Sequence, residues 1–462
     1  MIRGRFLDRY DMYDSIVPAQ SALHEDAVDG APDTDVGERE KDAPLLRIIV
    51  ATVGTTGDIA PFIVLAQTLM ARGHRVLMLA PALHASAVQT AGLPYRAVGT
   101  CEEMQSALEN PDLWHERKGW EVIWRSALPH LGAIRQAIQE VPERQPCAVL
   151  SHPLLAPAAS LARSARPDLR IAVAYLAPSN LFSVHDATSL GSLTIPAWVP
   201  LKVRRALWRA VHSWLNARTL PGLNAKRAHC RLPAVADFVE HMLQTPDVSL
   251  GLFPEWFARA QVDWPRPYVA AGTIFSDARA VMMPPDLERF LDAGEPPIVF
   301  TAGTGNLHAA RFFKIALQTL GEIERRGIFV TNHRDQIPCP LPPHVMWLAH
   351  APFSMLLRRA AAIVHHGGIG TTAEAMRAGI AQLIVPHAFD QFDNAHRARR
   401  CAGASIVLAK RLSVRRLRSA LTRLLTSPTV ALACREAEQR MASAPALETV
   451  IDRVEAALRR EG

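Results

Sequence analysis

The chain has 462 residues, more than one ordinary hydrophobic core holds, so we expect two domains. Hydrophobic residues make up 49% and charged residues 21% of it, which is typical of a folded soluble protein and argues against a disordered or fibrous chain. The net charge of +7 is modest, the six cysteines form no CxxC pair, and the chain has no run of about 18 apolar residues. These features argue against structural zinc, a disulfide framework and a membrane-spanning helix, and they favour a cytoplasmic protein.

Residues 1–43 are acid-rich and weakly periodic, so we expect them to form a flexible leader. A buried strand, LRIIVATV at 46–53, then runs into the glycine turn GTTGDIAP. PFIVLAQTLMARGH at 61–74 reads as an amphipathic helix, and RVLMLA at 75–80 as the next strand. Such a strand–helix–strand unit predicts a parallel sheet. Further strands are expected in PCAVLSH, RIAVAYLA and VSLGLF.

A basic stretch without acidic residues follows at 201–231. Its apolar residues recur at helical spacing: Val203, Leu207, Val211 and Trp214. The pattern predicts a helix with one packed side, and its basic face has two open interpretations. The face is either simply solvated, or it meets an anionic lipid-like acceptor or a membrane surface. No nucleic-acid motif accompanies the stretch, so we expect no nucleic-acid partner.

A proline-rich segment at 271–295 reads as a linker. A second series then opens with PIVFTAGTG, again a strand that runs into a glycine turn. Short apolar runs alternate with helical stretches after it: RGIFVT, HVMWLAH, AAIVHHGG and AQLIVPH. We therefore expect an N-terminal α/β domain at 44–270, a C-terminal α/β domain at 296–435, and closing helices at 436–462. Ligands of open parallel sheets bind beyond the carboxyl ends of the strands, so the site is expected in a cleft between the two domains.

The sharpest motif, VHHGGIGTTAEAMRAGIAQLIVPHAFDQFDNA, runs from 364 to 395. Gly368 and Gly370 let the backbone approach a ligand closely, and Thr371 helps to open a helix whose N–H groups suit a phosphate. His366 can add a donor to a diphosphate. Its neighbour His365 points to the opposite face of a strand, so joint metal ligation is disfavoured and we expect no catalytic metal.

Three polar residues follow the glycine turn. Glu374 lies one helical turn further on, where it can reach a sugar hydroxyl. Asp390 and Gln391 come after the next strand and supply an acceptor and an amide that suit polyol recognition. The motif therefore predicts a site for a sugar joined to a phosphate.

With the spacing HHGGIGTT, Glu374, Gly379, Pro386 and DQ, the region resembles the nucleotide-sugar signature of GT-B glycosyltransferases that act on small molecules in plants and bacteria. The resemblance covers about residues 45–435 and implies two Rossmann-like domains whose parallel sheets face each other across a cleft. It implies that the diphosphate is bound by His366, Gly368, Gly370 and Thr371. It also implies that the ribose is bound by Glu374 and the donor sugar by Asp390 and Gln391. TAGTG, which contains Gly303 and Thr304, resembles the loop near the diphosphate.

The position where many relatives stack a tryptophan on the base holds His350 in this chain. His350 offers less area for stacking, and the nearby Trp347 is an alternative. The identity of the base stays open from these residues.

Asp58 occupies the position at which many plant relatives carry the catalytic histidine of a GHxxP turn. The resemblance implies that it is the general base of an inverting, metal-independent transfer. The alternative is that it caps the following helix. Pro61 favours the first helical position, which makes Ala60 the better cap and leaves Asp58 free. Around it, Gly57, His152 and Trp208 are candidates for acceptor binding, whereas Asp186 reads as a plain loop residue.

GDIAPFIVLAQTLMARGH, LFPEWFARAQVDWPRP and HAFDQFDNA resemble more closely the rhamnosyltransferases that form mono-rhamnolipids. This resemblance implies dTDP-L-rhamnose as co-substrate, no further cofactor, and the hydroxyl of a 3-(3-hydroxyalkanoyloxy)alkanoic acid as acceptor. It allows peripheral contact with the inner face of the membrane.

The alternative is a glucosyltransferase that uses UDP- or dTDP-glucose on a sterol, macrolide or other apolar aglycone. A non-catalytic nucleotide-sugar-binding subunit and a sugar-nucleotide epimerase are further classes, and the intact set of site residues speaks against both.

Overall fold

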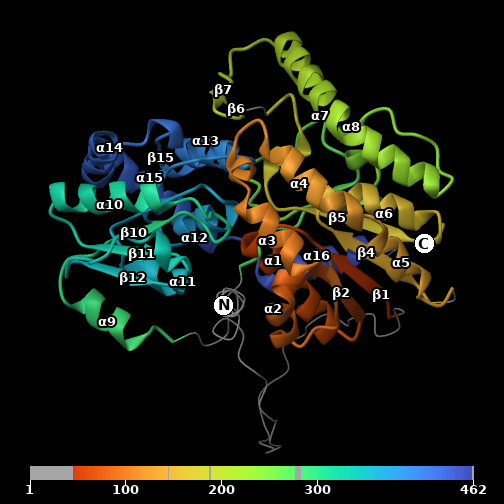
Figure 1. Cartoon of the computed structure of the whole chain (residues 1–462), viewed down its shortest axis with the longest axis horizontal. Helices are drawn as coiled ribbons and strands as arrows, with labels where there is room; N and C mark the ends of the chain where they lie inside the picture. The colour runs from red at the N-terminus through yellow and green to blue at the C-terminus, as the bar shows by residue number, and fades with distance from the viewer. Residues whose placement is uncertain (1–44, 144, 187–188, 276–281, 460–462) are drawn as a thin grey trace, which may run out of the picture.

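The computed structural model describes residues 45–143, 145–186, 189–275 and 282–459. The predicted leader at 1–43 lies outside them. Figure 1 shows two α/β lobes side by side, with the first half of the chain in one lobe and most of the second half in the other. Each lobe contains one parallel sheet flanked by helices, which confirms the predicted fold class.

The first lobe contains a seven-stranded parallel sheet in the order β3-β2-β1-β4-β5-β8-β9. Its strands are β1 (Arg47–Ala51), β2 (Arg75–Pro81), β3 (Tyr95–Val98), β4 (Cys147–Ser151), β5 (Arg170–Tyr175), β8 (Val248–Gly251) and β9 (Tyr268–Ala270). The five strands expected from apolar runs are confirmed. The two edge strands, β3 and β9, were missed because they are short and only partly buried, so they carry no continuous apolar run.

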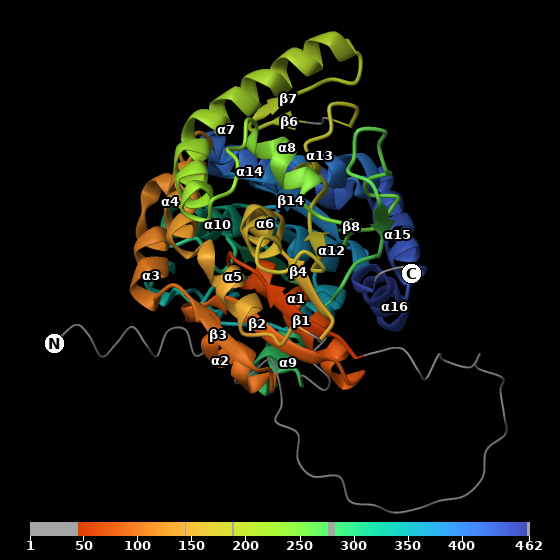
Figure 2. The same cartoon turned by 90° about the vertical axis from the view of Figure 1, so that its right-hand side faces the viewer.

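Helices cover both faces of this sheet: α1 (Thr56–Ala71), α2 (Ala85–Thr90), α3 (Cys101–Glu109), α4 (Gly119–Ala127), α5 (Gly132–Gln139), α6 (Ala156–Arg163), α7 (Leu201–His229) and α8 (Phe238–Gln244). The hairpin β6 (Ser189–Leu190) and β7 (Leu193–Thr194) lies beside the start of α7, which projects beyond the sheet in Figures 1 and 2. The basic stretch is thus a helix, as predicted.

The second lobe contains a six-stranded parallel sheet in the order β12-β11-β10-β13-β14-β15. Its strands are β10 (Ile298–Thr301), β11 (Gly327–Val330), β12 (Val345–Leu348), β13 (Ala362–His365), β14 (Ala381–Ile384) and β15 (Ser405–Ile406). Its helices are α9 (Pro285–Asp292), α10 (Ala310–Glu322), α11 (Phe353–Leu356), α12 (Ile369–Arg377), α13 (Gln391–Ala402), α14 (Val414–Thr426) and α15 (Pro428–Ala442). Because the strands are parallel, the loops at their carboxyl ends gather at one edge.

The domain boundaries expected from the sequence stay a prediction. The structure shows where two segments near these boundaries pack. Within the predicted linker, α9 buries Leu287 and Leu291 against the second sheet. The last helix, α16 (Leu447–Leu458), returns to the first lobe, where Val450 and Val454 join the core under α1. The two lobes are therefore connected by the chain twice. In the ranges that the structure covers, no helix combines the length and hydropathy needed to cross a membrane.

Candidate active site

One large cavity, about 960 Å³ in volume, is lined by both lobes. The first lobe contributes the turn after β1 and the segments after β4 and β5, and the second contributes the turns after β10 and β13. These are the carboxyl ends of the strands, where the sequence placed the site. The cavity is lined by these predicted residues: Gly57, Asp58, His152, Gly303, Thr304, His350, His366, Gly368, Gly370, Thr371, Glu374, Asp390 and Gln391.

Trp208 is the exception: it does not line the cavity, and its role as an acceptor-binding residue stays a prediction. It lies on α7 outside the cavity lining, and its indole N–H donates a hydrogen bond to the carbonyl oxygen of Phe182 at 2.6 Å. Phe182 itself lines the cavity. The helical pattern places Trp208 on the packed side of α7, but that side supports the cavity wall instead of forming it.

The prediction that Asp58 does not cap a helix is wrong. The helix α1 begins at Thr56, five residues before Pro61, and Thr55 is its N-cap. The carboxylate Oδ2 of Asp58 accepts hydrogen bonds from the Thr55 N–H at 2.8 Å and from the Thr55 hydroxyl at 3.2 Å. This is the acidic half of a capping box. Pro61 lies inside the helix, which loses one backbone hydrogen bond there.

Capping does not remove Asp58 from the cavity. Only Oδ2 is engaged, since Oδ1 accepts no hydrogen bond from any residue in the described part of the chain. Burial raises the pKa of Asp58 to about 6, against the two hydrogen bonds from Thr55, which lower it. The carboxylate is therefore a stronger base than a free aspartate and is ionised at neutral pH. The Asp58 side chain therefore stabilises the turn before α1 through Oδ2 and presents Oδ1 as a basic oxygen.

The glycine turn after β13 forms a concave, positively polarised surface. Gly367 has a φ of +94°, and Gly368 is the N-cap of α12, with no side chain satisfying the first N–H groups of that helix. The ring of His366 fits between two glycines, because a Cβ on Gly303 or Gly368 would lie within 2.8 or 2.5 Å of it. Free N–H groups at a helix N-terminus suit a diphosphate.

His366 is neutral in this environment. Burial, followed by the nearby His365 and His387, lowers its pKa to about 3. Its Nδ1 is buried and has no hydrogen-bond partner within the described ranges. A buried polar atom without a partner is costly, so a ligand that bonds to it is favoured. His365 is fully buried and bonds to Gln382 and to the Gly367 N–H, so it packs inside the second lobe.

The second lobe offers aromatic side chains that could contact a base, among them His350 and Phe353. His350 lines the cavity, and burial lowers its pKa. Trp347 does not line it, because its N–H donates to the Thr331 carbonyl and Arg334 covers its ring at 5.2 Å. Glu374 lines the cavity from α12 and pairs with Arg377 at 2.8 Å.

Asp390 faces Asp58 from the opposite lobe. Burial, and then the charge of Asp58, raise the pKa of Asp390 to about 7. Its Oδ2 accepts a hydrogen bond from Asn394 at 2.7 Å. Gln391 is less free than predicted, because its Oε1 accepts from the N–H groups of His387 at 2.8 Å and Ala388 at 3.2 Å. Two carboxyl groups thus flank the cavity, one from each lobe.

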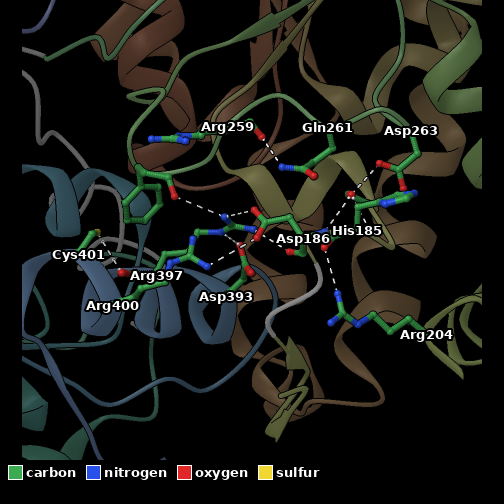
Figure 3. A network of polar contacts seen from close by, with 12 residues as sticks. His185, Asp186, Arg204, Arg259, Gln261, Asp263, Asp393, Arg397, Arg400 and Cys401 are labelled. Atoms are coloured by element: carbon green, nitrogen blue, oxygen red, sulfur yellow. Dashed lines mark hydrogen bonds and ion pairs between the residues drawn. The ribbon is translucent and has the colours of Figure 1, made fainter. Parts of the chain in front are cut away.

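A polar network between the lobes was missed from the sequence. Asp186, expected to be a plain loop residue, forms an ion pair with Arg397 of α13 and a longer one with Arg400 at 3.7 Å (Figure 3). Arg397 also pairs with Asp393 at 2.6 Å and is 2% exposed. Asp186 is thus a loop residue, as expected, but it also joins the two lobes through an ion pair that the sequence did not show. Its partner is 211 residues away in the chain, so no local pattern could have shown the pair.

No group of three or more His, Cys, Asp or Glu side chains in the described ranges is placed to hold a metal ion. The expectation of metal-independent catalysis stays a prediction. The positive charge available to a leaving group in this cavity comes from the α12 N-terminus and its adjoining turn.

Two family models match the chain. Residues 48–153 match the glycosyltransferase family 28 N-terminal domain, and residues 314–457 match the erythromycin biosynthesis protein CIII-like C-terminal domain. The first match falls on the first lobe, and the second runs from α10 of the second lobe to α16, which packs on the first lobe.

Curated relatives and a solved structure agree with these matches. O-mycaminosyltylonolide 6-deoxyallosyltransferase of Streptomyces fradiae is 28% identical over 87% of this chain and 95% of its own length. Glycosyltransferase GtfE of Amycolatopsis orientalis is 31% identical over 75% of this chain and 82% of its own length. The spinosyn rhamnosyltransferase SpnG, solved with thymidine diphosphate, shares the fold with a TM-score of 0.60 at 17% identity, over 89% of this chain and 99% of that chain. The chain is therefore a glycosyltransferase enzyme and belongs to the GT-B glycosyltransferase family that includes GtfE.

Proposed function

We propose that this enzyme transfers L-rhamnose from dTDP-L-rhamnose to the hydroxyl of a 3-(3-hydroxyalkanoyloxy)alkanoic acid, with inversion at the anomeric carbon. The observation that carries the proposal is the shared cavity, in which Asp58 of one lobe faces the glycine turn of the other. Around Asp58 the lining is largely apolar: Met104, Leu108, Leu113, Trp114, Trp120, Ile123, Leu154, Phe182 and Met242. A wall of this kind suits alkyl chains.

In the proposed reaction, Oδ1 of Asp58 takes the proton of the acceptor hydroxyl as its oxygen attacks C1 of the sugar. The bond from C1 to the diphosphate oxygen breaks, and the diphosphate leaves with the electron pair. The N–H groups at the start of α12 and the His366 ring stabilise the charge that develops on it. A single displacement of this kind inverts C1. Asp390 and Gln391 would bind the sugar hydroxyls, so that the sugar lies between the carboxyl groups of Asp58 and Asp390.

The donor proposal rests on similarity. The tylonolide relative is named as a deoxyallosyltransferase and SpnG as a rhamnosyltransferase bound to thymidine diphosphate, so deoxysugars and thymidine nucleotides recur among proteins like this one. Within that group, rhamnose is proposed from the resemblance of the chain as a whole to the rhamnosyltransferases that form mono-rhamnolipids, and not from a set of residues that dictates rhamnose.

A second candidate is a neutral aglycone, and one feature of the cavity favours it. No Lys or Arg occurs among the cavity-lining residues that the structure describes, whereas Asp58, Glu103, Glu374 and Asp390 all do. A fatty carboxylate inside this lining would meet acidic groups without a cationic partner, which is costly. A hydroxy acid must therefore bind with its carboxylate at the mouth, while a macrolide or sterol would face no such constraint.

A matrix of donors and acceptors tests both candidates. Purified enzyme is incubated with dTDP-L-rhamnose or UDP-glucose, each against a 3-(3-hydroxyalkanoyloxy)alkanoic acid, its methyl ester and a macrolide aglycone, and products are identified by mass spectrometry. We expect rhamnosylation of the free hydroxy acid. Preference for the ester or the macrolide would support the second candidate, a neutral aglycone. Transfer of glucose would overturn the proposal that dTDP-L-rhamnose is the donor.

Peripheral contact with an anionic membrane is part of the proposal, because such an acceptor partitions into lipid. Leu193, Trp198 and Val203 are exposed by 59%, 79% and 47% at the hairpin and the start of α7. Arg205 and Arg209 are exposed on the same helix, so apolar and basic side chains occur together. Arg204, in contrast, donates to the carbonyls of His185 at 3.1 Å and Val199 at 2.9 Å and belongs to the fold.

Arg205→Glu/Arg209→Glu, alone and with Trp198→Ser, is expected to lower binding to phosphatidylglycerol vesicles by at least about tenfold, since each basic residue near an anionic surface is worth about 1 kcal/mol. Co-sedimentation measures the effect, with phosphatidylcholine vesicles as reference. Arg415→Glu/Arg423→Glu on α14, an equal charge reversal on exposed arginines of the other lobe, is the matched control. Equal loss in both pairs would show that only net charge matters and would remove the surface from the proposal.

A further inference from the structure

His84 reaches the general base through a single peptide group. The carbonyl oxygen of Gly54 lies 3.1 Å from Nε2 of His84. The N–H of the same Gly54–Thr55 peptide donates to Oδ2 of Asp58 at 2.8 Å. One rigid, planar amide therefore connects the two side chains, with one end held by His84 and the other bonded to Asp58.

The direction of the first hydrogen bond is fixed by chemistry. A carbonyl oxygen only accepts, so Nε2 of His84 must carry the hydrogen. His84 is 6% exposed, and burial lowers its pKa to about 4, so the ring is neutral at the pH at which the enzyme would work. Of the charged groups described around this residue, none contributes to that shift, which comes from burial against the Gly54 hydrogen bond.

Gly54 leaves little freedom for any other arrangement. Its φ of +114° lies in the region that favours glycine, and a Cβ added to it would lie 2.3 Å from Oδ2 of Asp58. The turn is thus packed directly against the carboxylate. A buried donor on the Gly54 carbonyl holds this peptide in the orientation that the packing allows.

We propose that His84 is a positioning residue for Asp58: by holding the Gly54 carbonyl it directs the Thr55 N–H at Oδ2, which leaves Oδ1 aimed at the acceptor. It touches neither substrate nor the reacting atoms. Its effect is on the geometry and basicity of Asp58, whose charge also acts on Asp390, the residue before α13. The inference goes beyond the substrates proposed above, because it concerns the base whatever the sugar and acceptor are.

The test compares His84→Phe, which keeps a ring of similar size without the donor, with His84→Gln, whose amide can still donate. With the acceptor found best in the donor–acceptor matrix, His84→Phe is expected to lower kcat by about tenfold to a hundredfold with the KM for donor unchanged, since misplacement of a reacting group by about 1 Å costs this much. The acid limb of the pH profile should move to higher pH, because the Thr55 hydrogen bond lowers the pKa of Asp58 and would be weakened. His84→Gln should recover most of the rate.

Two comparisons separate positioning from simple loss of stability. His74→Phe removes a histidine that is 3% exposed and lies just before β2, where its Nδ1 accepts a hydrogen bond from the Leu46 N–H and its Nε2 lies 3.1 Å from Glu455. It should lower Tm without moving the pH profile. In an Asp58→Asn background, His84→Phe should cost no further rate. An unmoved acid limb, or an equal further loss in that background, would overturn the proposal.

Discussion

Asp58→Asn is expected to lower kcat by about 10³-fold while the Kd for thymidine diphosphate stays within about twofold of wild type. General-base catalysis contributes about 10²–10⁴ to such rates. Asparagine has nearly the same shape and its Oδ1 can still accept from Thr55, so the turn and α1 should persist. Only the capacity to take a proton is lost. Initial rates and calorimetric titration with the nucleotide measure the two quantities.

The stability of this variant provides an independent check. Burial raises the pKa of Asp58 in the folded state to about 6 from the ordinary value of 3.8, so the native state binds more protons than the unfolded state between those pH values. Its contribution to stability is therefore present below about pH 4 and is lost as the pH rises through about 6. At pH 8 the Tm of Asp58→Asn should equal or exceed that of wild type. A lower Tm with a normal rate would mean that the capping role dominates and that the base lies elsewhere.

The pH dependence of the wild-type enzyme follows from the same group. The base is active when ionised, so kcat/KM should fall as the pH drops through about 6. Asp390, with a pKa raised to about 7, makes the acid limb steeper if its ionised form holds the sugar. The two carboxyl groups interact, so the limb reports the pair and not one residue alone.

The fold, and the side of the cavity formed by the motif at 364–395, could be predicted from the sequence. Apolar runs that end in glycine turns recur in both halves, and each such run in this chain is a buried parallel strand. The spacing from His366 to Gln391 placed these residues around one turn, because strand, helix and strand lengths are nearly fixed in a unit of this kind. Local periodicity therefore suffices where the chain near a site is continuous.

The features that the sequence did not show are edge strands without an apolar run, the balance at a helix end, and contacts between distant parts of the chain. The start of α1 was misplaced because Pro61 outweighed the Thr55–Asp58 pairing, which has the spacing of a capping box. Trp208 does not line the cavity, because no local pattern in the sequence shows what its face of α7 packs against. His84 shows no signal at all, since its partner is a backbone carbonyl 30 residues away.

The second large effect is expected from Arg397, which connects the two lobes. Arg397→Met removes the cation from between Asp186 and Asp393, and breaking a buried pair by removing one partner costs about 3–5 kcal/mol. Thermal unfolding should show a clearly lower Tm. Arg400→Met is the matched control, because Arg400 is adjacent to the same Asp186 but its side chain is 56% exposed at 3.7 Å, a geometry worth about 0–1 kcal/mol.

Arg397→Met should also raise the KM for donor and acceptor together. The helix α13 that carries Arg397 begins at Gln391, next to Asp390, while the segment that leads to Asp186 contributes Phe182 to the opposite wall. If both walls depend on this pair, loosening it misplaces both substrates, and the two KM values should rise in parallel while those of Arg400→Met do not. A fall in Tm with both KM values unchanged would mean that the pair stabilises the fold without aligning the walls of the cavity.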